Sequence, residues 1–291
     1  MRRAVLIGSN GQLGSEINKL WSTKHAYQVD SELVCLTHSD IEITDLEKVE
    51  SVLGNIDPTL VINTAGFLRV DECEKLPETA LAVNSIGALN LAEYCRQNET
   101  LLVQLSTDYV FDGCKREPYN EDDKAEPVGA YGLSKLMGEF FVRYMLPESH
   151  VIVRTSGLFG PAGSTNKGGN FIETMLRLAD AGKSLRVVDD QLFSPTYAPD
   201  LAEAVLGLIE AGARGIFHVS NDGCTSWYGF ARTAFDLAEV DADLSPTTTA
   251  AYGSPARRPA YSVLDNSRTR RYTGLKMPSW QDGLQRYLAA R

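Results

Sequence analysis

The stretch "VLIGSNGQLGSEI", residues 5–17, decides the fold of this 291-residue chain. A short apolar run ends at Gly8 and a helical pattern follows, which predicts a strand, a glycine-rich turn and a helix. The spacing G-x-x-G-x-x-G is a variant of the dinucleotide fingerprint with a longer first gap. In such a turn Gly8 allows the sharp bend, Gly11 lets the backbone approach a pyrophosphate, and Gly14 lets the helix pack on the strand. A purely structural turn would use the same glycines, so both interpretations stay open at this point.

A dinucleotide at this turn would contact the turn itself and residues that follow neighbouring strands. The helix N-terminus offers free N–H groups and the positive end of its dipole to the phosphates. An acidic residue for the ribose 2′-hydroxyl is expected about 20 residues after the turn, but Thr37 and His38 stand there and Asp40 comes slightly later. This leaves room for a 2′-phosphate and tilts the expected cofactor toward NADPH, with NADH still open. The expected cofactor-binding residues are Gly8, Asn10, Gly11, Gln12, Leu13, Gly14, Asp40, Ile41 and Ala65, together with Tyr131 and Lys135.

Short apolar runs alternate with longer helical patterns through the first half of the chain. The apolar runs predict strands at 4–7, 33–36, 59–63, 101–107 and 151–156. The helical patterns predict helices at 12–21, after Thr44, at 77–98 and at 128–145. Thr44 with Glu47 three residues later has the pattern of a capping box. Because the strands are apolar on both faces, the expected fold class is α/β, a Rossmann-type doubly wound parallel sheet covered on both sides.

Beyond residue 156 the alternation becomes irregular. We expect helices at 171–180, 199–210, 227–238 and 279–289, strands at 185–189 and 215–219, a loop at 160–169 and an irregular Pro-rich tract at 246–262. The expected domains are a dinucleotide-binding domain at 1–156 and a smaller α+β lobe, mainly for the substrate, at 157–291. Segments around 186–220 returning to the first domain are an open alternative. Such lobes shape a cleft at the carboxyl ends of the strands.

The composition excludes several classes of partner. The formal net charge is −10 at pH 7, whereas a nucleic-acid surface shows a basic excess. No stretch approaches the roughly 18 apolar residues of a membrane span. The five cysteines include no C-x-x-C pair, and the four histidines have no metal-ligand spacing. We therefore expect no nucleic acid, no membrane, no metal, and a reducing, cytoplasmic location.

A second group of residues is typical of carbonyl reduction by hydride transfer. Tyr131 and Lys135, in "YGLSK", lie four residues apart on one helix face. Thr107 ends a strand whose carboxyl end lies at the same sheet edge as Gly8. A phenol can give a proton to the carbonyl oxygen, an ammonium group lowers the pKa of that phenol, and a hydroxyl can hold the carbonyl. Tyr131 and Lys135 alone would be an ordinary surface pair, and only their combination with Thr107 and the turn favours catalysis.

Seven motifs follow one another along nearly the whole chain: "GSNGQLG", "STDYVFDG", "PYNEDD", "AYGLSKLMGE", "NFIETMLRLA", "DQLFSPTYAPDLA" and "RRPAYSVLDNSR". Together they resemble the dTDP-4-dehydrorhamnose reductase family of the extended short-chain dehydrogenases/reductases. The resemblance implies a C-terminal lobe for a nucleotide sugar and reduction of a dTDP-linked 4-keto-6-deoxy sugar by NADPH or NADH. It implies a catalytic set of Thr107, Tyr131 and Lys135, and substrate binding by Val70, Thr107, Tyr109, Asn170 and Arg258. Some members dimerise through a metal held by acidic side chains; no such acidic cluster stands out here, so a homodimer stays open.

Three residues depart from the family pattern near the expected sugar pocket. Gly157 stands where a Trp is usual, Leu68 where a Thr is frequent, and Phe193 where a small residue is usual. They suggest an altered sugar with the reduction chemistry kept. Two alternatives stay open: an epimerase or dehydratase of a nucleotide sugar, and a regulatory subunit of the methionine adenosyltransferase type. A dehydratase commonly has Asp-Glu after the Thr, and here Asp108 is followed by Tyr109.

Overall fold

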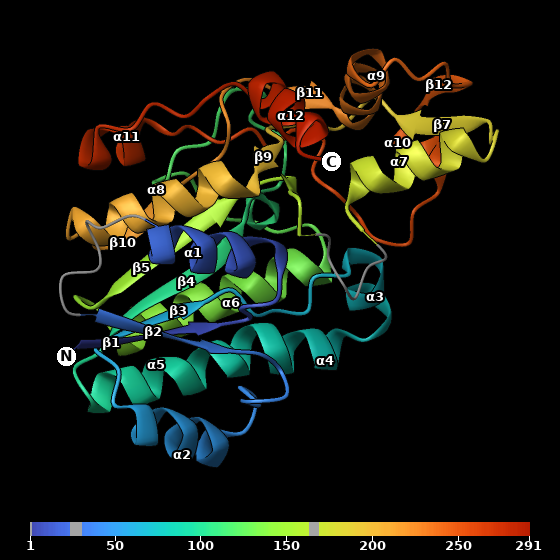
Figure 1. Ribbon diagram of the computed structural model, residues 1–291. Helices are drawn as coiled ribbons and strands as arrows, with labels where there is room; N and C mark the ends of the chain where they lie inside the picture. The colour runs from blue at the N-terminus through green and yellow to red at the C-terminus, as the bar shows by residue number, and fades with distance from the viewer. Residues whose placement is uncertain (1, 24–30, 163–168) are drawn as a thin grey trace.

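A six-stranded sheet forms the centre of the computed structural model, which describes residues 2–23, 31–162 and 169–291 (Figure 1). Its order is β10-β5-β4-β3-β1-β2, and every pairing within it is parallel. The predicted Rossmann-type doubly wound sheet is thereby confirmed. The strands are β1 (Arg2–Ile7), β2 (Ser31–Leu36), β3 (Leu60–Asn63), β4 (Leu101–Thr107), β5 (His150–Thr155) and β10 (Gly215–His218).

Helices cover both faces of this sheet, because the strands present apolar side chains to each side. Along β1, Leu6 belongs to one buried cluster and Val5 to the other, as the alternation of strand side chains requires. In Figure 1, α1 and α8 lie above the sheet and α2 and α5 below it. The covering helices are α1 (Gln12–Thr23), α2 (Leu46–Ile56), α5 (Gly87–Gln97), α6 (Ala130–Met145) and α8 (Ala198–Glu210).

The strand order reverses direction between β1 and β3. The chain runs from β1 to β2 on one side of this point and through β3, β4 and β5 on the other. The chain segments that leave the carboxyl ends of β1 and β3 therefore lead to opposite sides of the sheet, which leaves a crevice between them. Open α/β sheets bind their ligands at such a switch point. The glycine turn directly follows β1, so the topology places it at the edge of that crevice.

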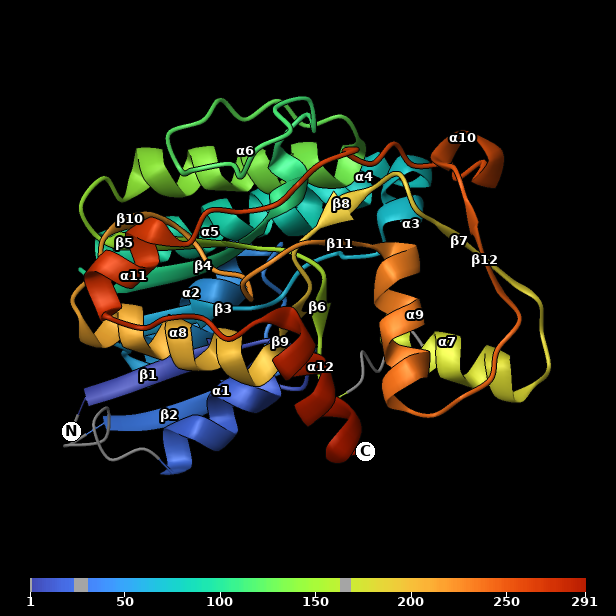
Figure 2. The same cartoon turned by 90° about the horizontal axis from the view of Figure 1, so that it is seen from above.

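A second, smaller layer of helices and short strands stands beside the carboxyl edge of the sheet (Figure 2). Its aromatic core is separate from the two clusters of the sheet and includes Phe159, Phe193, Phe230 and Trp280. The elements are β6 (Leu158–Phe159), α7 (Phe171–Asp180), β7 (Leu185–Val188), β8 (Leu192–Phe193), β9 (Thr196–Tyr197), β11 (Thr225–Ser226), α9 (Trp227–Leu237), β12 (Leu244–Thr247), α10 (Thr249–Tyr252) and α12 (Trp280–Ala289). Helix α11 (Ser267–Thr273) lies apart from them and packs on α8 and β10. The division into two domains at residue 156 stays a prediction. Two later elements contact the first part of the chain: α8 packs on α1, and β10 pairs with β5.

Three local expectations differ from the structure. The N-cap of α2 is Asp45, which accepts from the Lys48 N–H at 3.2 Å, so the capping box at Thr44 was wrong. The region expected as one helix at 77–98 is α4 (Pro77–Leu81), a π-helical turn η2 (Ala82–Ile86) and α5. In the π turn, Asn84 is directed inward and bonds to Phe67 and Ser134. The tract at 246–262 was expected to be irregular because of its Pro and Gly content. It includes part of β12 and all of α10.

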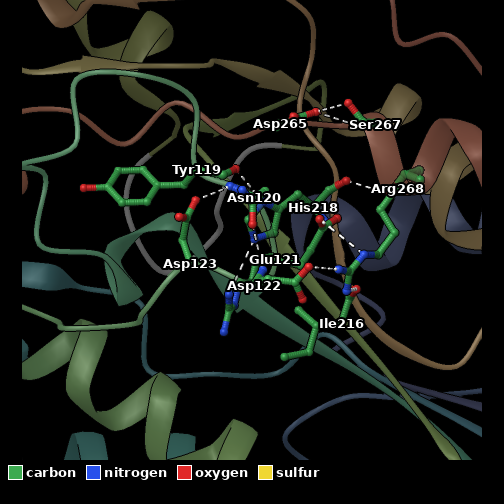
Figure 3. A network of polar contacts seen from close by, with 12 residues as sticks. Tyr119, Asn120, Glu121, Asp122, Asp123, Ile216, His218, Asp265, Ser267 and Arg268 are labelled. Atoms are coloured by element: carbon green, nitrogen blue, oxygen red, sulfur yellow. Dashed lines mark hydrogen bonds and ion pairs between the residues drawn. The ribbon is translucent and has the colours of Figure 1, made fainter.

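A polar network ties the loop before α6 to β10 and α11 (Figure 3). The Glu121 carboxylate accepts from the His218 backbone N–H at 2.9 Å, and Arg268 pairs with Glu121 and Asp122 at 3.5 and 2.7 Å. The His218 ring meets the Tyr119 carbonyl at 2.9 Å, and burial lowers the pKa of His218 well below its usual value. The network adds to the backbone bonds that Tyr119 makes with Val263 and Asp265 of the C-terminal tract.

Within the described ranges, no helix is both long enough and apolar enough to cross a lipid bilayer.

The contact between α1 and the end of β1 makes Gly14 a sensitive position. A Cβ on Gly14 would overlap the Gly8 carbonyl oxygen and lie 2.8 Å from the Ser9 Cα, both rigid backbone atoms. We expect Gly14→Ala to lower the free energy of unfolding by about 1–3 kcal/mol, the usual cost of overpacking. Urea denaturation measures this change.

The matched control is Gly54→Ala in α2, where a Cβ would meet no atom within 4 Å. This change is expected to raise stability by about 0.5–1 kcal/mol, because alanine favours the helix. Equal stability of the two variants would contradict the close-contact explanation.

Candidate active site

A cleft of about 370 Å³ opens at the carboxyl ends of β1, β3, β4 and β5, between the sheet and the smaller lobe. It gathers predicted residues that are far apart in the sequence. Those that line it are Gly11, Gln12, Leu13, Ala65, Val70, Thr107, Tyr109, Tyr131, Lys135 and Asn170. Parallel topology explains this gathering, since it brings every strand's carboxyl end to one edge.

The glycine turn has the geometry that a diphosphate would need. Gly8 has φ +79° and its carbonyl accepts from the Gly11 N–H at 3.0 Å, which closes the turn. Gly11 faces the cleft, and α1 begins at Gln12, so the first N–H groups of the helix point there. In the described part of the chain, the buried Gln12 Oε1 and Thr155 Oγ1 have no hydrogen-bond partner. Both residues line the cleft, and an orphaned buried polar atom fits a site that a polar ligand completes.

Thr107 and Tyr131 both line the cleft. Thr107 is the last residue of β4, and Tyr131 lies in the first turn of α6. The Glu74 carboxylate accepts from the Ala130 N–H at 2.7 Å and so supplies the side-chain cap for α6. Glu74 was assigned no chemistry from the sequence, but it fixes the start of the helix that carries Tyr131.

Burial raises the pKa of the Tyr131 phenol above its usual value, and the Thr107 side chain opposes that shift only in part. The negative charges of Asp108 and of other nearby groups act in the same direction as burial. Lys135 is not among the largest causes of this shift, so its expected lowering of the Tyr131 pKa stays a prediction. A phenol in this environment stays protonated at neutral pH and is able to act as an acid.

Lys135 is buried one helical turn beyond Tyr131. Its Nζ donates to the Leu105 carbonyl at 2.6 Å. Burial lowers the pKa of the ammonium group to about 8, and the negative charge of Glu139 opposes this shift. Glu139 is itself paired with Arg154 at 2.6 Å and accepts from Ser106 at 2.5 Å. The Leu105 carbonyl on β4 thus holds the ammonium group near the end of that strand.

Several predicted residues lie outside the residues that line this cleft: Gly8, Asn10, Gly14, Asp40, Ile41 and Arg258. The Asp40 carboxylate accepts from the backbone and the hydroxyl of Thr37, at 2.8 and 2.7 Å, and these bonds lower its pKa. Ile41 is buried in the core beneath the sheet. The assignments of these residues to the cofactor stay predictions, because the turn after β2 already uses Asp40.

Arg258 and Asp71 form a pair behind Tyr109. The Arg258 guanidinium lies 3.1 Å from Asp71, which also accepts from Ser254 at 2.8 Å. The positive charge of Arg258 also opposes the rise that burial causes in the pKa of the Tyr109 phenol. Asp71 was missed as a site residue, because an acid at the start of a short helix looks like a cap. It holds Arg258, which lies outside the cleft lining, near Tyr109, which lines the cleft.

Asn170 also has structural partners. Its side chain accepts from the Glu173 N–H at 2.9 Å as the cap of α7, and it donates to the Gly160 carbonyl and the Tyr287 hydroxyl. It lines the cleft where α7 begins. Part of the loop expected at 160–169, residues 163–168, lies outside the described residues.

The cleft has an aromatic wall formed by Phe159, Phe171, Phe193, Trp227 and Phe230. The Phe193 and Trp227 rings stack with centroids 4.0 Å apart. Phe193 also covers Gly157, since a Cβ there would lie 2.6 Å from the Phe193 Cδ2. The two departures noted in the sequence therefore touch each other, and the ring of one occupies the side-chain space of the other.

This contact makes Gly157 intolerant of a side chain. We expect Gly157→Ala to destabilise the protein by the left-handed strain of φ +51°, about 1–2 kcal/mol, plus about 1–3 kcal/mol for displacing the Phe193 ring. Gly182→Ala is the control, because Gly182 has φ +64° and open space around it, so only the strain remains. Chemical denaturation measures both.

Adding Phe193→Leu should recover part of the loss at Gly157→Ala and none at Gly182→Ala. Equal losses in the two single variants would show that the ring does not constrain Gly157.

The whole chain matches the family model described as the RmlD substrate binding domain, over residues 1–291. It is 40% identical to the spore coat polysaccharide biosynthesis protein SpsK of Bacillus subtilis, over all of this chain and 98% of that protein. It is 36% identical to a dTDP-4-dehydrorhamnose reductase of Aggregatibacter actinomycetemcomitans, over 98% of each chain. A crystal structure of the dTDP-4-dehydrorhamnose reductase of Bacillus anthracis in complex with NADP superposes with a TM-score of 0.92 at 36% identity, covering 100% of both chains. The chain therefore belongs to the RmlD substrate binding domain family, together with the dTDP-4-dehydrorhamnose reductases.

Proposed function

We propose that this protein reduces the 4-keto group of a dTDP-linked deoxysugar, dTDP-4-dehydro-L-rhamnose first of all, with NADPH or NADH as hydride donor. The observation that carries the proposal is the meeting of Thr107, Tyr131 and Lys135 in one cleft with the glycine turn. Membership of the reductase family supports the same chemistry. The slight tilt toward NADPH rests only on the missing acid after β2.

The residues of the cleft divide the work of such a reduction. A reduced nicotinamide supplies the hydride when it is bound. Gly11, Gln12 and Leu13 would hold its diphosphate through backbone N–H groups, and Lys135 has ammonium hydrogens beyond the one given to Leu105 for the ribose. Tyr131, protonated at neutral pH, gives its phenolic proton to the substrate oxygen as that oxygen gains charge.

The aromatic wall and the Tyr109–Arg258 pair are the proposed binding surfaces for the nucleotide sugar. An apolar, flat wall suits the faces of a pyrimidine base and a deoxysugar. Arg258 has a planar guanidinium that suits a diphosphate, although Asp71 already holds one of its edges. Val70 and Asn170 complete the proposed substrate set. Because Phe193 takes the side-chain space of Gly157, this wall differs from the family pattern in the part proposed to contact the sugar.

The two other functions have weaker support. An epimerase or dehydratase commonly has Asp-Glu after the threonine, and here Tyr109 follows Asp108. A regulatory subunit has no need of a protonated phenol beside a buried ammonium group. Tightly bound NAD that survives purification would favour the first alternative, and cofactor binding without turnover would favour the second.

Three further statements belong to this proposal. The free cysteines favour a reducing, cytoplasmic location. A homodimer is carried over from relatives as a hypothesis that sedimentation tests. Residues 1–156 with α8 and β10 are proposed as the cofactor domain, and the remaining part of 157–291 is proposed to bind the sugar.

Tyr131→Phe tests the acid. It removes the proton and little else, so we expect turnover to fall by about 10²–10⁴-fold, the range for one general acid. NADPH oxidation with dTDP-4-dehydro-L-rhamnose measures it. Tyr144→Phe is the matched control, because Tyr144 lies on the same helix and is 83% exposed. Full activity in Tyr131→Phe would overturn the assignment.

Lys135 should make the reaction and the stability sensitive to pH. Its folded pKa of about 8 lies below the usual lysine value, so its charge is lost as pH rises through 8, and kcat/KM should decline there. Between pH 8 and the unfolded lysine pKa near 10.4, Lys135 keeps its proton in the unfolded chain but has lost it in the folded chain. A rise in pH then favours the folded state, so this group should increase the free energy of unfolding by up to about 1.4 kcal/mol per pH unit.

Comparison of wild type with Lys135→Met by denaturation at pH 7 and pH 9.5 isolates this contribution from other titrating groups. The wild type should gain stability relative to Lys135→Met on going to the higher pH. A parallel pH dependence in the two proteins would mean that Lys135 titrates normally.

A further inference from the structure

Thr155 is a cleft residue for which the reaction described above has no role. It is the last residue of β5, and it lines the cleft. Its hydroxyl oxygen Oγ1 is buried and, among the residues that the structure describes, has no hydrogen-bond partner. A buried hydroxyl without a partner costs stability. Beside a ligand cleft, such a hydroxyl is suited to a partner that arrives with the ligand.

The alternation of strand side chains shows which face of the sheet Thr155 occupies. Arg154, the residue before it, is directed toward α6, where it pairs with Glu139 at 2.6 Å. Val153 is directed the other way, into the buried cluster that contains side chains of α1 and α8. Thr155 follows Val153 by the same alternation. Its side chain therefore lies on the α1 side of the sheet edge.

Thr155 lies directly beside the proposed reaction centre. Thr107, the last residue of β4, is its partner in the parallel register of β4 and β5, and neighbouring strands are about 4.8 Å apart. Leu105, two residues before Thr107, belongs to the same cluster as Val153, so the two threonine side chains leave the sheet on the same face. A ligand group that binds Thr155 is thus about one strand spacing from Thr107.

A second orphaned atom lies at the other end of the cleft. Gln12 is the first residue of α1, and its Oε1 is also buried without a partner in the described part of the chain. The order β1-β3-β4-β5 puts three strand spacings, about 14 Å, between the ends of β1 and β5. One sugar ring is much shorter than this distance. A dinucleotide whose diphosphate lies at the start of α1 binds across such a crevice, so it is the ligand that can complete both atoms.

We propose that the Thr155 hydroxyl binds the carboxamide group of the cofactor's nicotinamide and so orients the ring that carries the hydride. This rests on the proposed function. The carboxamide has N–H donors and a carbonyl acceptor, and a threonine hydroxyl can pair with either. Thr155 is then a cofactor-binding residue at the end of β5, at the opposite end of the cleft from the glycine turn. It takes no part in the proton transfer from Tyr131.

The first test measures cofactor binding without turnover. Titration of the full-length protein with NADPH and with NADH, followed by nicotinamide fluorescence, gives the Kd of the preferred cofactor. We expect this Kd to be about 3- to 10-fold higher for Thr155→Val than for the wild type, the range for one hydrogen bond. Thr155→Ser keeps the hydroxyl and should bind the cofactor as the wild type does. ADP-ribose or its 2′-phosphate, which are the same cofactors without the nicotinamide, should bind all three proteins equally by calorimetry.

The second test measures the stability of the protein without cofactor. Thr155→Val replaces an unpaired buried hydroxyl by a methyl group of similar size, so it should raise the urea midpoint. Thr100→Val is the matched control, because the buried Thr100 hydroxyl donates to the Pro58 carbonyl at 2.8 Å. Thr100 precedes β4, at the end of the strand away from the cleft. This control should lower the urea midpoint and leave the cofactor Kd unchanged.

The possible failures are distinguishable. A wild type that binds neither NADPH nor NADH overturns the proposed function, and this proposal with it. A wild type that binds its cofactor, with a Kd that is unchanged in Thr155→Val, overturns the role of Thr155 alone. A change confined to the KM of the nucleotide sugar, or an equal weakening of ADP-ribose binding, would also contradict the assignment to the nicotinamide. A loss of stability in Thr155→Val as large as that in Thr100→Val would show that the hydroxyl is already paired in the protein alone.

Discussion

The approach of α1 to the end of β1 is the constraint on which the rest of the site depends. Gly14 lies against the Gly8 backbone with no room for a Cβ, so the helix starts at the sheet edge and its first N–H groups point into the cleft. This places a helix N-terminus, the end of a helix that favours anions, next to the switch point between β1 and β3. Thr107, Tyr131 and Lys135 reach the same point because parallel strands end together.

Burial then determines the protonation states within the cleft. It raises the pKa of the Tyr131 phenol and lowers that of the Lys135 ammonium group. An acid that must hold its proton until the substrate takes it gains from the first effect. The buried Lys135 ammonium group donates to the Leu105 carbonyl, and Glu139 on the same helix is paired with Arg154. The polar groups are costly to bury, and each is paired with a neighbour from another element.

The smaller lobe contributes the apolar half of the cleft. Phe193, stacked on Trp227, covers Gly157, so an aromatic ring from β8 lines the pocket while position 157 carries no side chain. The lobe also supplies Ser262 to Asp108, 154 residues away in the chain. The placement of the two lobes is thereby linked to the polar contacts beside Thr107.

The sequence by itself determined the parallel sheet, because buried strands leave apolar runs and the glycine spacing marks the first turn. It also identified Thr107, Tyr131 and Lys135 as one group, because strand ends and an i,i+4 helix pair have local signatures. The π turn at Asn84, the cap from Glu74, the Asp71–Arg258 pair and the contact of Phe193 with Gly157 were decided only by tertiary structure. In each of these a side chain meets a partner from a distant segment, and no local pattern records which partner that is. The pKa of Tyr131 belongs with them, since it follows from burial, which exists only once the two lobes have packed.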